Sequence, residues 1–239
     1  MRTAVLNTVT YFPASVQPVA QTSVSSNPRR TSSRHAGLDR DDVVEAALLL
    51  VDEGGPEALT MRRLAGKLGV ATTTIYWHVG SRDDVVDAVI RRHGERQAEH
   101  AVSGDTARQR VMSVARHLRD EALAHRGITR LAELHGETSV LNEHLEVAMA
   151  RELTTAGVVG EDARDALRAI LICVGGFLVV AMRNEAAIPP DHSRTAVWSR
   201  VDDPNVDPST RLALTTQVDL PVLFERTVQA IVDTHVPEA

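Results

Sequence analysis

The chain has 239 residues, 43% of them apolar, which is enough to bury a core as one large domain or two small ones. Its formal net charge of −6 excludes a uniformly basic nucleic-acid binder, although the charges are unevenly distributed. The first residues show no secretory signal, the apolar run 169–182 is shorter than a membrane-spanning helix requires, and the single Cys173 excludes an internal disulfide. We therefore expect a cytoplasmic protein without membrane contact.

Residues 1–36 form the first predicted segment. They are rich in Ser, Thr, Pro, Val and Arg, and they lack a sustained hydrophobic period. This composition predicts a disordered N-terminal arm. Its basic stretch NPRRTSSRH leaves two interpretations open, a solvated tail or an arm that follows DNA phosphates into a minor groove.

Order is expected to begin at residue 37 with a small helical domain over 37–84. In LDRDDVVEAALLLVDEGG, Asp39 has the spacing of an N-cap with Asp42, and the Gly54-Gly55 pair ends the helix. In LTMRRLAGKLG, Thr60 can cap a second short helix that stops at Gly69. The pattern predicts two helices that each turn one apolar side inward.

The segment TTTIYWHV at 72–79 predicts a third helix of about two turns, held by packing because its β-branched residues disfavour a free helix. A longer helix follows, and Ser81 with Asp84 has the spacing of a capping box at its start. Two short helices joined by a turn that contains Gly are typical of a helix-turn-helix. The sequence therefore predicts a three-helix DNA-binding head.

Residues 85–239 are predicted to form a helical body, and no convincing strand appears, so the fold class is all-α. The body begins with an apolar stripe at helical spacing that ends before Gly127. A short helix over 128–135 and a helix that ends at Gly157 follow. A long apolar helix with Gly175 and Gly176 is expected over 161–187. A Pro-containing loop over 188–208 and a final helix from Asp219 complete it.

The third predicted helix has unusual side chains for so small a domain. Ile75 and Val79 should face inward, which leaves the Thr, Tyr and Trp side chains outside. Hydroxyl groups can bond to phosphates or base edges, and Thr methyl groups can contact a thymine methyl. The alternative is that Tyr76 and Trp77 only pack the small domain.

The stretch GGPEALTMRRLAGKLGVATTTIYWHVGSRDDVVDAV resembles the tetracycline-repressor (TetR) family of transcriptional regulators. The similarity extends over residues 38–93 and is carried by the Leu-Thr before the first motif helix, the Leu-Ala-x-x-Leu-Gly-Val within it and the Tyr-Trp-His-Val run. The resemblance implies an N-terminal DNA-binding head on a helical body for ligand binding and dimerisation.

The resemblance also implies roles for individual residues. The start of the first motif helix, at positions 61 and 62, would meet DNA. In the second motif helix, positions 72–74 would read bases, positions 76 and 78 would face phosphates, and position 77 would do both. Position 82 would add a cationic contact. With the neighbouring Thr60, the predicted DNA-binding residues are Thr60, Met61, Arg62, Thr72, Thr73, Thr74, Tyr76, Trp77, His78 and Arg82. The tetracycline repressors have Gln-Pro-Thr at the three Thr positions, so a different operator is expected.

The body of the family is a dimer built by two long C-terminal helices of each subunit, which suits residues 163–187 and 219–234 here. An almost wholly apolar helix must be buried, either in a monomer core or against a partner. A family ligand would occupy a cavity in the body, and the tentative contacts for an apolar effector are His117, His135, Met149 and Phe177.

We expect no cofactor and no metal site. The metal-ligating histidine of the tetracycline repressors has no counterpart at matching spacing. His135 and His144 with the nearby Glu137 and Glu143 match no defined ligand pattern. No Gly-x-Ser-x-Gly, phosphate-binding loop, His-Glu-x-x-His or paired Cys motif is present, so an enzyme is not expected.

With these patterns, the resemblance implies a ligand-responsive transcriptional regulator of the bacterial cytoplasm, associated with the nucleoid when it is bound to DNA. We expect a repressor that binds a palindromic double-stranded operator as a homodimer and is released by a small molecule. A transcriptional activator and a ligand-independent DNA-binding dimer of the same fold are the alternatives that the sequence leaves open.

Overall fold

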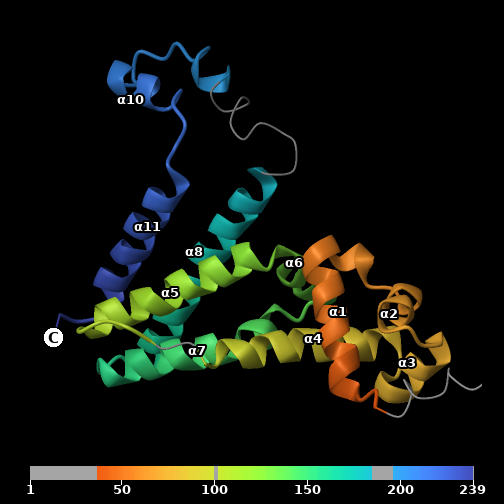
Figure 1. Cartoon of the computed structure of the whole chain (residues 1–239). Coiled ribbons are helices and arrows are strands. Elements are labelled where there is room, and N and C mark those ends of the chain that lie inside the picture. The colour runs from red at the N-terminus through yellow and green to blue at the C-terminus, as the bar shows by residue number, and fades with distance from the viewer. Residues whose placement is uncertain (1–36, 100–101, 185–195, 239) are drawn as a thin grey trace, which may run out of the picture. The chain divides into compact units, whose positions relative to one another are not determined.

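The computed structural model describes residues 37–99, 102–184 and 196–238, so the predicted N-terminal arm lies outside the described residues. Residues 37–239 form one compact unit. Every regular element of the described chain is helical and none of it is a strand, which confirms the predicted all-α class (Figure 1).

The head begins with α1 (Arg40–Gly54), a 3-10 turn η1 (Pro56–Ala58) and α2 (Met61–Leu68). The predicted caps are confirmed: Asp39 and Asp42 form a reciprocal capping box, and the Thr60 hydroxyl accepts a hydrogen bond from the Arg63 amide at 3.2 Å. Gly69 ends α2 in the left-handed conformation, with φ of 68°, which glycine adopts without steric cost. The turn into the next helix is therefore fixed by local chemistry.

Helix α3 (Thr72–Val79) is the predicted third helix. Its residues have low helix propensity, and the buried side chains of Ile75 and Val79 hold it against the rest of the head core. Full burial of two such side chains supplies about 1.5–3 kcal/mol each. Tertiary packing therefore decides the conformation of this segment.

Helix α4 (Arg82–Gln97) links the head to the body, because it contacts α1 and also α6 and α7 (Figure 1). Its start confirms the predicted capping box: the Asp84 carboxylate accepts hydrogen bonds from the Ser81 amide and hydroxyl, both at 2.7 Å. These bonds from Ser81 lower the pKa of Asp84. The helix runs well past Ile90, so it is longer than its apolar pattern alone indicates.

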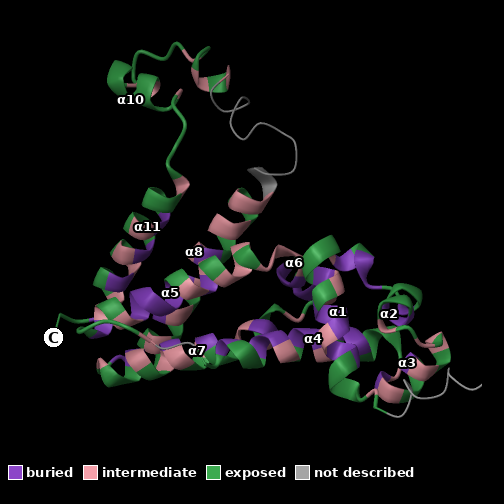
Figure 2. Ribbon diagram, viewed as in Figure 1, coloured by how far each residue is buried: buried purple, intermediate pink, exposed green. Residues whose placement is uncertain are grey.

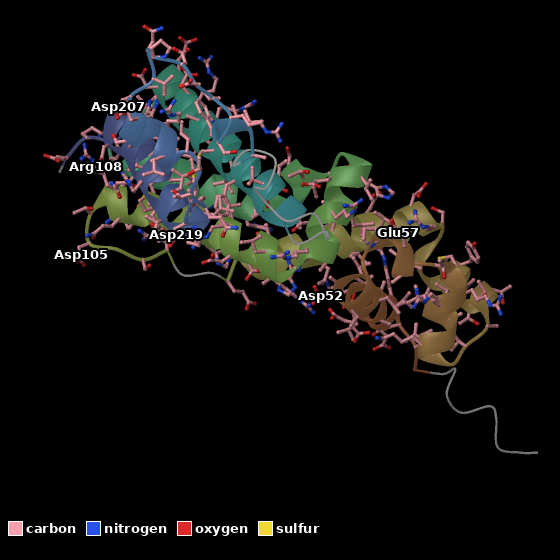
Figure 3. The ribbon with its side chains drawn as sticks, turned by 90° about the horizontal axis from the view of Figure 1, so that it is seen from above. Asp52, Glu57, Asp105, Arg108, Asp207 and Asp219 are labelled. Carbon is pink, nitrogen blue, oxygen red and sulfur yellow. The ribbon has the colours of Figure 1, made fainter. Side chains whose placement is uncertain are left out.

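The body contains the remaining helices. They are α5 (Ala107–Ala124), α6 (Arg126–His135), α7 (Thr138–Thr155), α8 (Gly160–Asn184), α10 (Pro208–Ala213) and α11 (Leu220–His235). Side chains of α5, α7, α8 and α11 build a second apolar core that is distinct from the head core. Arg108, labelled in Figure 3, ties α5 to the end of α11 by donating to the Val236 carbonyl at 2.7 Å.

The head core does not stop at the predicted boundary after residue 84. It includes Ile128, Leu131 and Ala132 of α6, and Leu141 of α7. Glycine makes this junction possible, because a Cβ added to Gly127 would overlap the Val51 carbonyl of α1. Helix α6 is therefore packed directly onto the head.

Two boundary predictions are wrong. Gly127 lies inside α6, and the break between α5 and α6 falls at His125, because packing against α1 requires a glycine there rather than a turn. Pro208 was predicted to lie in a loop, but it begins α10, where its fixed φ suits the first helical position. The predicted end of the long helix at 187 lies outside the described residues.

Helix α8 differs from its sequence-based expectation in two respects. Residues Gly160–Met182 are long and apolar enough to cross a membrane by length and composition, so the predicted exclusion on length is wrong. Only 17% of its most apolar window is buried, and Figure 2 shows many half-buried and exposed residues on α8. Among the described residues, α8 therefore presents an exposed apolar face, and such faces mark contact sites.

Candidate nucleic-acid interface

The outer surface of α3 exposes the aromatic residues singled out in the sequence. The Trp77 side chain is 82% exposed and Tyr76 is 51% exposed, whereas Ile75 is fully buried one position earlier. Thr73 is exposed, and Thr72 and Thr74 are half-buried. Core packing therefore does not account for Trp77, and Tyr76 contributes to packing with only part of its ring.

The ring of His78 lies against Trp77. The two ring centroids are 4.9 Å apart and the planes are inclined at 86°, an edge-to-face arrangement that restricts the orientation of the exposed indole. A restricted ring loses less conformational entropy when it binds a partner. The aromatic surface of α3 is thus partly preorganised.

The start of α3 offers backbone donors. Unlike α1, α2 and α4, this helix has no side-chain cap, because its N-cap position is occupied by Ala71. The Thr74 amide bonds to the Ala71 carbonyl, and the earlier amides of the first turn are left for an outside acceptor. Free amides at a helix N-terminus, with the helix dipole behind them, suit a phosphate oxygen.

The basic residues around α3 differ in how far they are already engaged. Arg62 and Arg63 are exposed on α2, and neither forms an ion pair with any residue that the structure describes. Lys67 lies 3.4 Å from Glu53, and Arg82 donates from Nε to the Leu59 carbonyl at 3.3 Å. Arg62 and Arg63 are therefore the cations with the most freedom to meet a phosphate.

One of the predicted contacts needs revision. Met61 is only 8% exposed and belongs to the head core, so a DNA contact through its side chain is not supported. Met61 is the first residue of α2. The family pattern places this position near DNA but does not reveal that its side chain is buried. The sequence prediction did not include Arg63, whose exposed side chain follows Arg62 on α2.

Two of the four tentative effector contacts, Met149 and Phe177, belong to the apolar core of the body. Met149 is fully buried in the body core, and Phe177 packs edge-to-face on Phe224 with centroids 4.9 Å apart. His117 lies half-buried on α5, and His135 ends α6. A hollow of about 490 Å³ lies elsewhere, over residues 198–215, and none of the four lines it. Their role in ligand binding is therefore carried forward as part of a proposal.

Comparisons with known proteins agree with this geometry. The family model described as "Bacterial regulatory proteins, tetR family" matches residues 43–89. The class D tetracycline repressor of Escherichia coli is 38% identical over 101 residues, which cover 38% of this chain and 46% of that protein. The class A repressor from transposon 1721, also from E. coli, is 32% identical over 154 residues, covering 63% and 68%.

Two solved structures share the fold. Apo ActR from Streptomyces coelicolor is 24% identical with a TM-score of 0.63, covering 82% of this chain and 94% of that one. Mycobacterium smegmatis BioQ is 26% identical with a TM-score of 0.56, covering 82% and 97%. The match to the class D repressor spans about half of that protein's length.

A helix-turn-helix with an exposed second helix, placed on an all-α body, defines a DNA-binding transcriptional regulator. The chain belongs to the tetracycline-repressor (TetR) family, and the predicted resemblance is confirmed. Its relatives are transcriptional regulators and not enzymes.

Proposed function

We propose that this chain represses transcription by binding a palindromic operator as a homodimer, with α3 of each subunit in the major groove. The observation that carries the proposal is the exposed Trp77 on a helix whose opposite side is anchored by buried Ile75 and Val79. An anchored helix can present Thr73, Tyr76 and Trp77 to base edges and phosphates without first refolding.

Dimerisation is supported by the exposed apolar surface of α8 and α11, which pack against each other within the chain. Ile172 on α8 is 74% exposed, and Val179, Val180, Val222 and Leu223 on the two helices are also exposed. Gly175 and Gly176 have open space beside them, so a second backbone can approach closely there. A symmetric pair also presents α3 twice, and two half-sites give the specificity that one short helix lacks.

The proposed signal is an apolar small molecule bound in the body. The fold supports this by analogy, since ActR has been solved in complex with actinorhodin. Among the four tentative contacts, Phe177 is the best placed, because its half-buried ring lies against Phe224 where α8 meets α11. His117, His135 and Met149 remain part of the proposal with weaker support. Such an effector shifts the equilibrium because it binds more tightly to the dimer conformation with one head-to-head spacing than to the conformation with the other.

The first test identifies the operator. The chain is used to select fragments of its source genome, and the bound sites are mapped and compared. We expect a two-fold symmetric sequence with half-sites about one helical turn apart. Selected fragments without symmetry, or binding no tighter than to random DNA, would contradict the proposal.

The second test measures the salt dependence of Arg62→Ala on that operator. Loss of one phosphate contact should weaken binding and reduce the slope of log K against log salt by about one. Arg200→Ala, an exposed Arg outside the head, is the matched control and should bind as the wild type does. An unchanged slope for Arg62→Ala would show that α2 does not meet the DNA backbone.

A further inference from the structure

Three metal-ligating side chains converge where α4, α5 and α6 meet. His93 comes from α4, Glu121 from α5, and His125 occupies the break between α5 and α6. One ligand atom from each residue lies within 4.8 Å of the other two. None of the three residues belongs to α3 or to the four tentative effector contacts.

These side chains face one another without forming hydrogen bonds. Nε2 of His93 lies 3.8 Å from the Glu121 carboxylate, and Nε2 of His125 lies 3.7 Å from the same oxygen. Both distances exceed the hydrogen-bond range. They are close to the separation of neighbouring ligands around an ion whose metal–ligand bonds are about 2.0–2.2 Å. The three atoms therefore lie close enough together to surround one ion.

Asp52 provides a second, independent observation. Its carboxylate on α1, labelled in Figure 3, lies 3.0 Å from Nδ1 of His125. A carboxylate that accepts the Nδ1 proton holds the imidazole in the tautomer whose Nε2 lone pair is free, and this Nε2 faces Glu121 and His93. Carboxylate–histidine–metal chains of this form orient the ligands of many zinc sites.

We propose that His93 and His125, through Nε2, and Glu121, through its carboxylate, bind one divalent transition-metal ion, with zinc as the probe. Two imidazoles and one carboxylate leave a fourth tetrahedral position for water or an exogenous ligand. The charges of Glu121 and Asp52 together neutralise a divalent ion. His93 is 5% exposed, whereas His125 and Glu121 are reached from solvent, which gives the ion a route of entry.

The sequence did not predict this site because its ligands come from separate helices. Glu121 and His125 are four positions apart, but His93 is far from both along the chain, and no zinc motif has that spacing. The sequence-based expectation of no metal site considered the metal-ligating histidine of the family, the known zinc motifs, and His135 and His144 with their acidic neighbours, but not this cluster. Packing of α4 against α6 and the body creates the cluster.

An ion bound at this site would connect α4, which runs from the head into the body, to α5 and α6. His93 lies on α4, and Asp52 on α1 holds His125, so one ion would connect α1, α4 and the α5–α6 break. This consequence rests on the proposed DNA-binding function, whereas metal binding itself does not. A bound ion would favour one head position and so change operator affinity.

The test uses the full chain without an affinity tag, stripped with a chelator and titrated with zinc by calorimetry. Cobalt absorption provides a second readout of tetrahedral coordination. We expect one ion per chain, a loss of binding in His93→Gln and His125→Gln, and a 10–100-fold weaker affinity in Asp52→Asn. His144→Gln, an exposed histidine elsewhere in the body, is the matched control and should bind as the wild type does.

Circular dichroism checks that each variant is folded, and His125→Gln, at a half-exposed site, serves if His93→Gln does not fold. The proposal is overturned if the wild type takes up no zinc, or if a folded His125→Gln variant binds it unchanged. Because no DNA is present in this titration, its failure is separate from a failure of operator binding. Operator affinity measured with and without zinc then tests the coupling.

Discussion

At the residue scale, Trp77 combines high exposure with a restrained ring. Solvent-exposed apolar side chains are common on protein surfaces, and one alone indicates little. Here the ring lies beside His78, next to the half-exposed Tyr76, on a helix whose first amides have no side-chain cap. Such a combination favours a contact surface over an incidental exposed residue.

Replacement of this ring separates binding from folding. Trp77→Ala should change the free energy of unfolding by no more than about 0.5 kcal/mol, because the side chain makes few contacts in the folded chain. Operator affinity should fall at least about tenfold, as expected for an aromatic residue near the centre of an interface. Denaturant unfolding and operator titration measure the two effects.

Leu134→Ala is the control for this prediction, because Leu134 is also largely exposed but lies on α6, outside the head. It should leave both stability and operator affinity unchanged. Equal losses of affinity in the two variants would argue against a specific role for Trp77.

At the element scale, the helix termini were predictable from the sequence and the long-range contacts were not. The caps at Asp39, Thr60 and Ser81 depend on residues within one turn, so local spacing reveals them. The burial of Met61 and the place of Gly127 inside α6 depend on elements far away in the sequence. Most of the α3 surface could likewise be predicted, because a two-turn helix with buried Ile75 and Val79 must expose its neighbours.

The contact between α6 and α1 can be tested at Gly127. A methyl group there would overlap the Val51 carbonyl, so Gly127→Ala should destabilise the fold by about 1–3 kcal/mol. Gly66→Ala on α2 meets nothing within 4 Å and should instead stabilise its helix by up to about 1 kcal/mol. Thermal unfolding should show a lower melting temperature for Gly127→Ala and a higher one for Gly66→Ala. If both substitutions stabilise the protein, α6 and α1 are not in close contact.

The ion pairs between α5 and α11 give a pH-dependent contribution. Hydrogen bonds from Arg116, with a smaller effect of Arg119, lower the pKa of Glu225 below its ordinary value of 4.5. A carboxyl group whose pKa is lowered in the folded state stabilises that state above its unfolded pKa. This stabilisation is lost as the pH falls below 4.5 and through the lower native pKa of Glu225.

Glu225→Gln should therefore be less stable than the wild type at pH 7, and the difference should shrink as the medium becomes acidic. Urea unfolding at a series of pH values measures that difference. Glu143→Gln, at an exposed site on α7, is the control and should follow the wild type throughout. If the stability difference between Glu225→Gln and the wild type stays constant from neutral to acidic pH, the loss of stability comes from packing and not from charge.

At the scale of the whole molecule, the exposed apolar surface of α8 and α11 and the exposed face of α3 have a common explanation in a symmetric pair of chains. Among the residues that the structure describes, none covers Trp77 on α3 or Ile172 on α8, which are 82% and 74% exposed. In the proposed homodimer, a second subunit would cover the apolar surface, and the two α3 helices would meet two half-sites.

A charge placed in the proposed interface should separate the subunits. Ile172→Glu, at a site 74% exposed in the single chain, should shift the sedimentation coefficient to that of a monomer and weaken operator binding. Leu134→Glu adds the same charge at another exposed apolar site and should remain a dimer. A wild type that sediments as a monomer, or a dimeric Ile172→Glu variant, would exclude this interface.

The most direct test of the central claim follows the Trp77 ring itself. The chain has only two tryptophans, so Trp198→Phe leaves Trp77 as the single indole reporter. When the selected operator is added, we predict a change in Trp77 emission and protection of the ring from acrylamide quenching, with both effects saturating at one dimer per site. Operator binding that leaves the emission and the quenching of Trp77 unchanged would show that α3 does not dock against DNA.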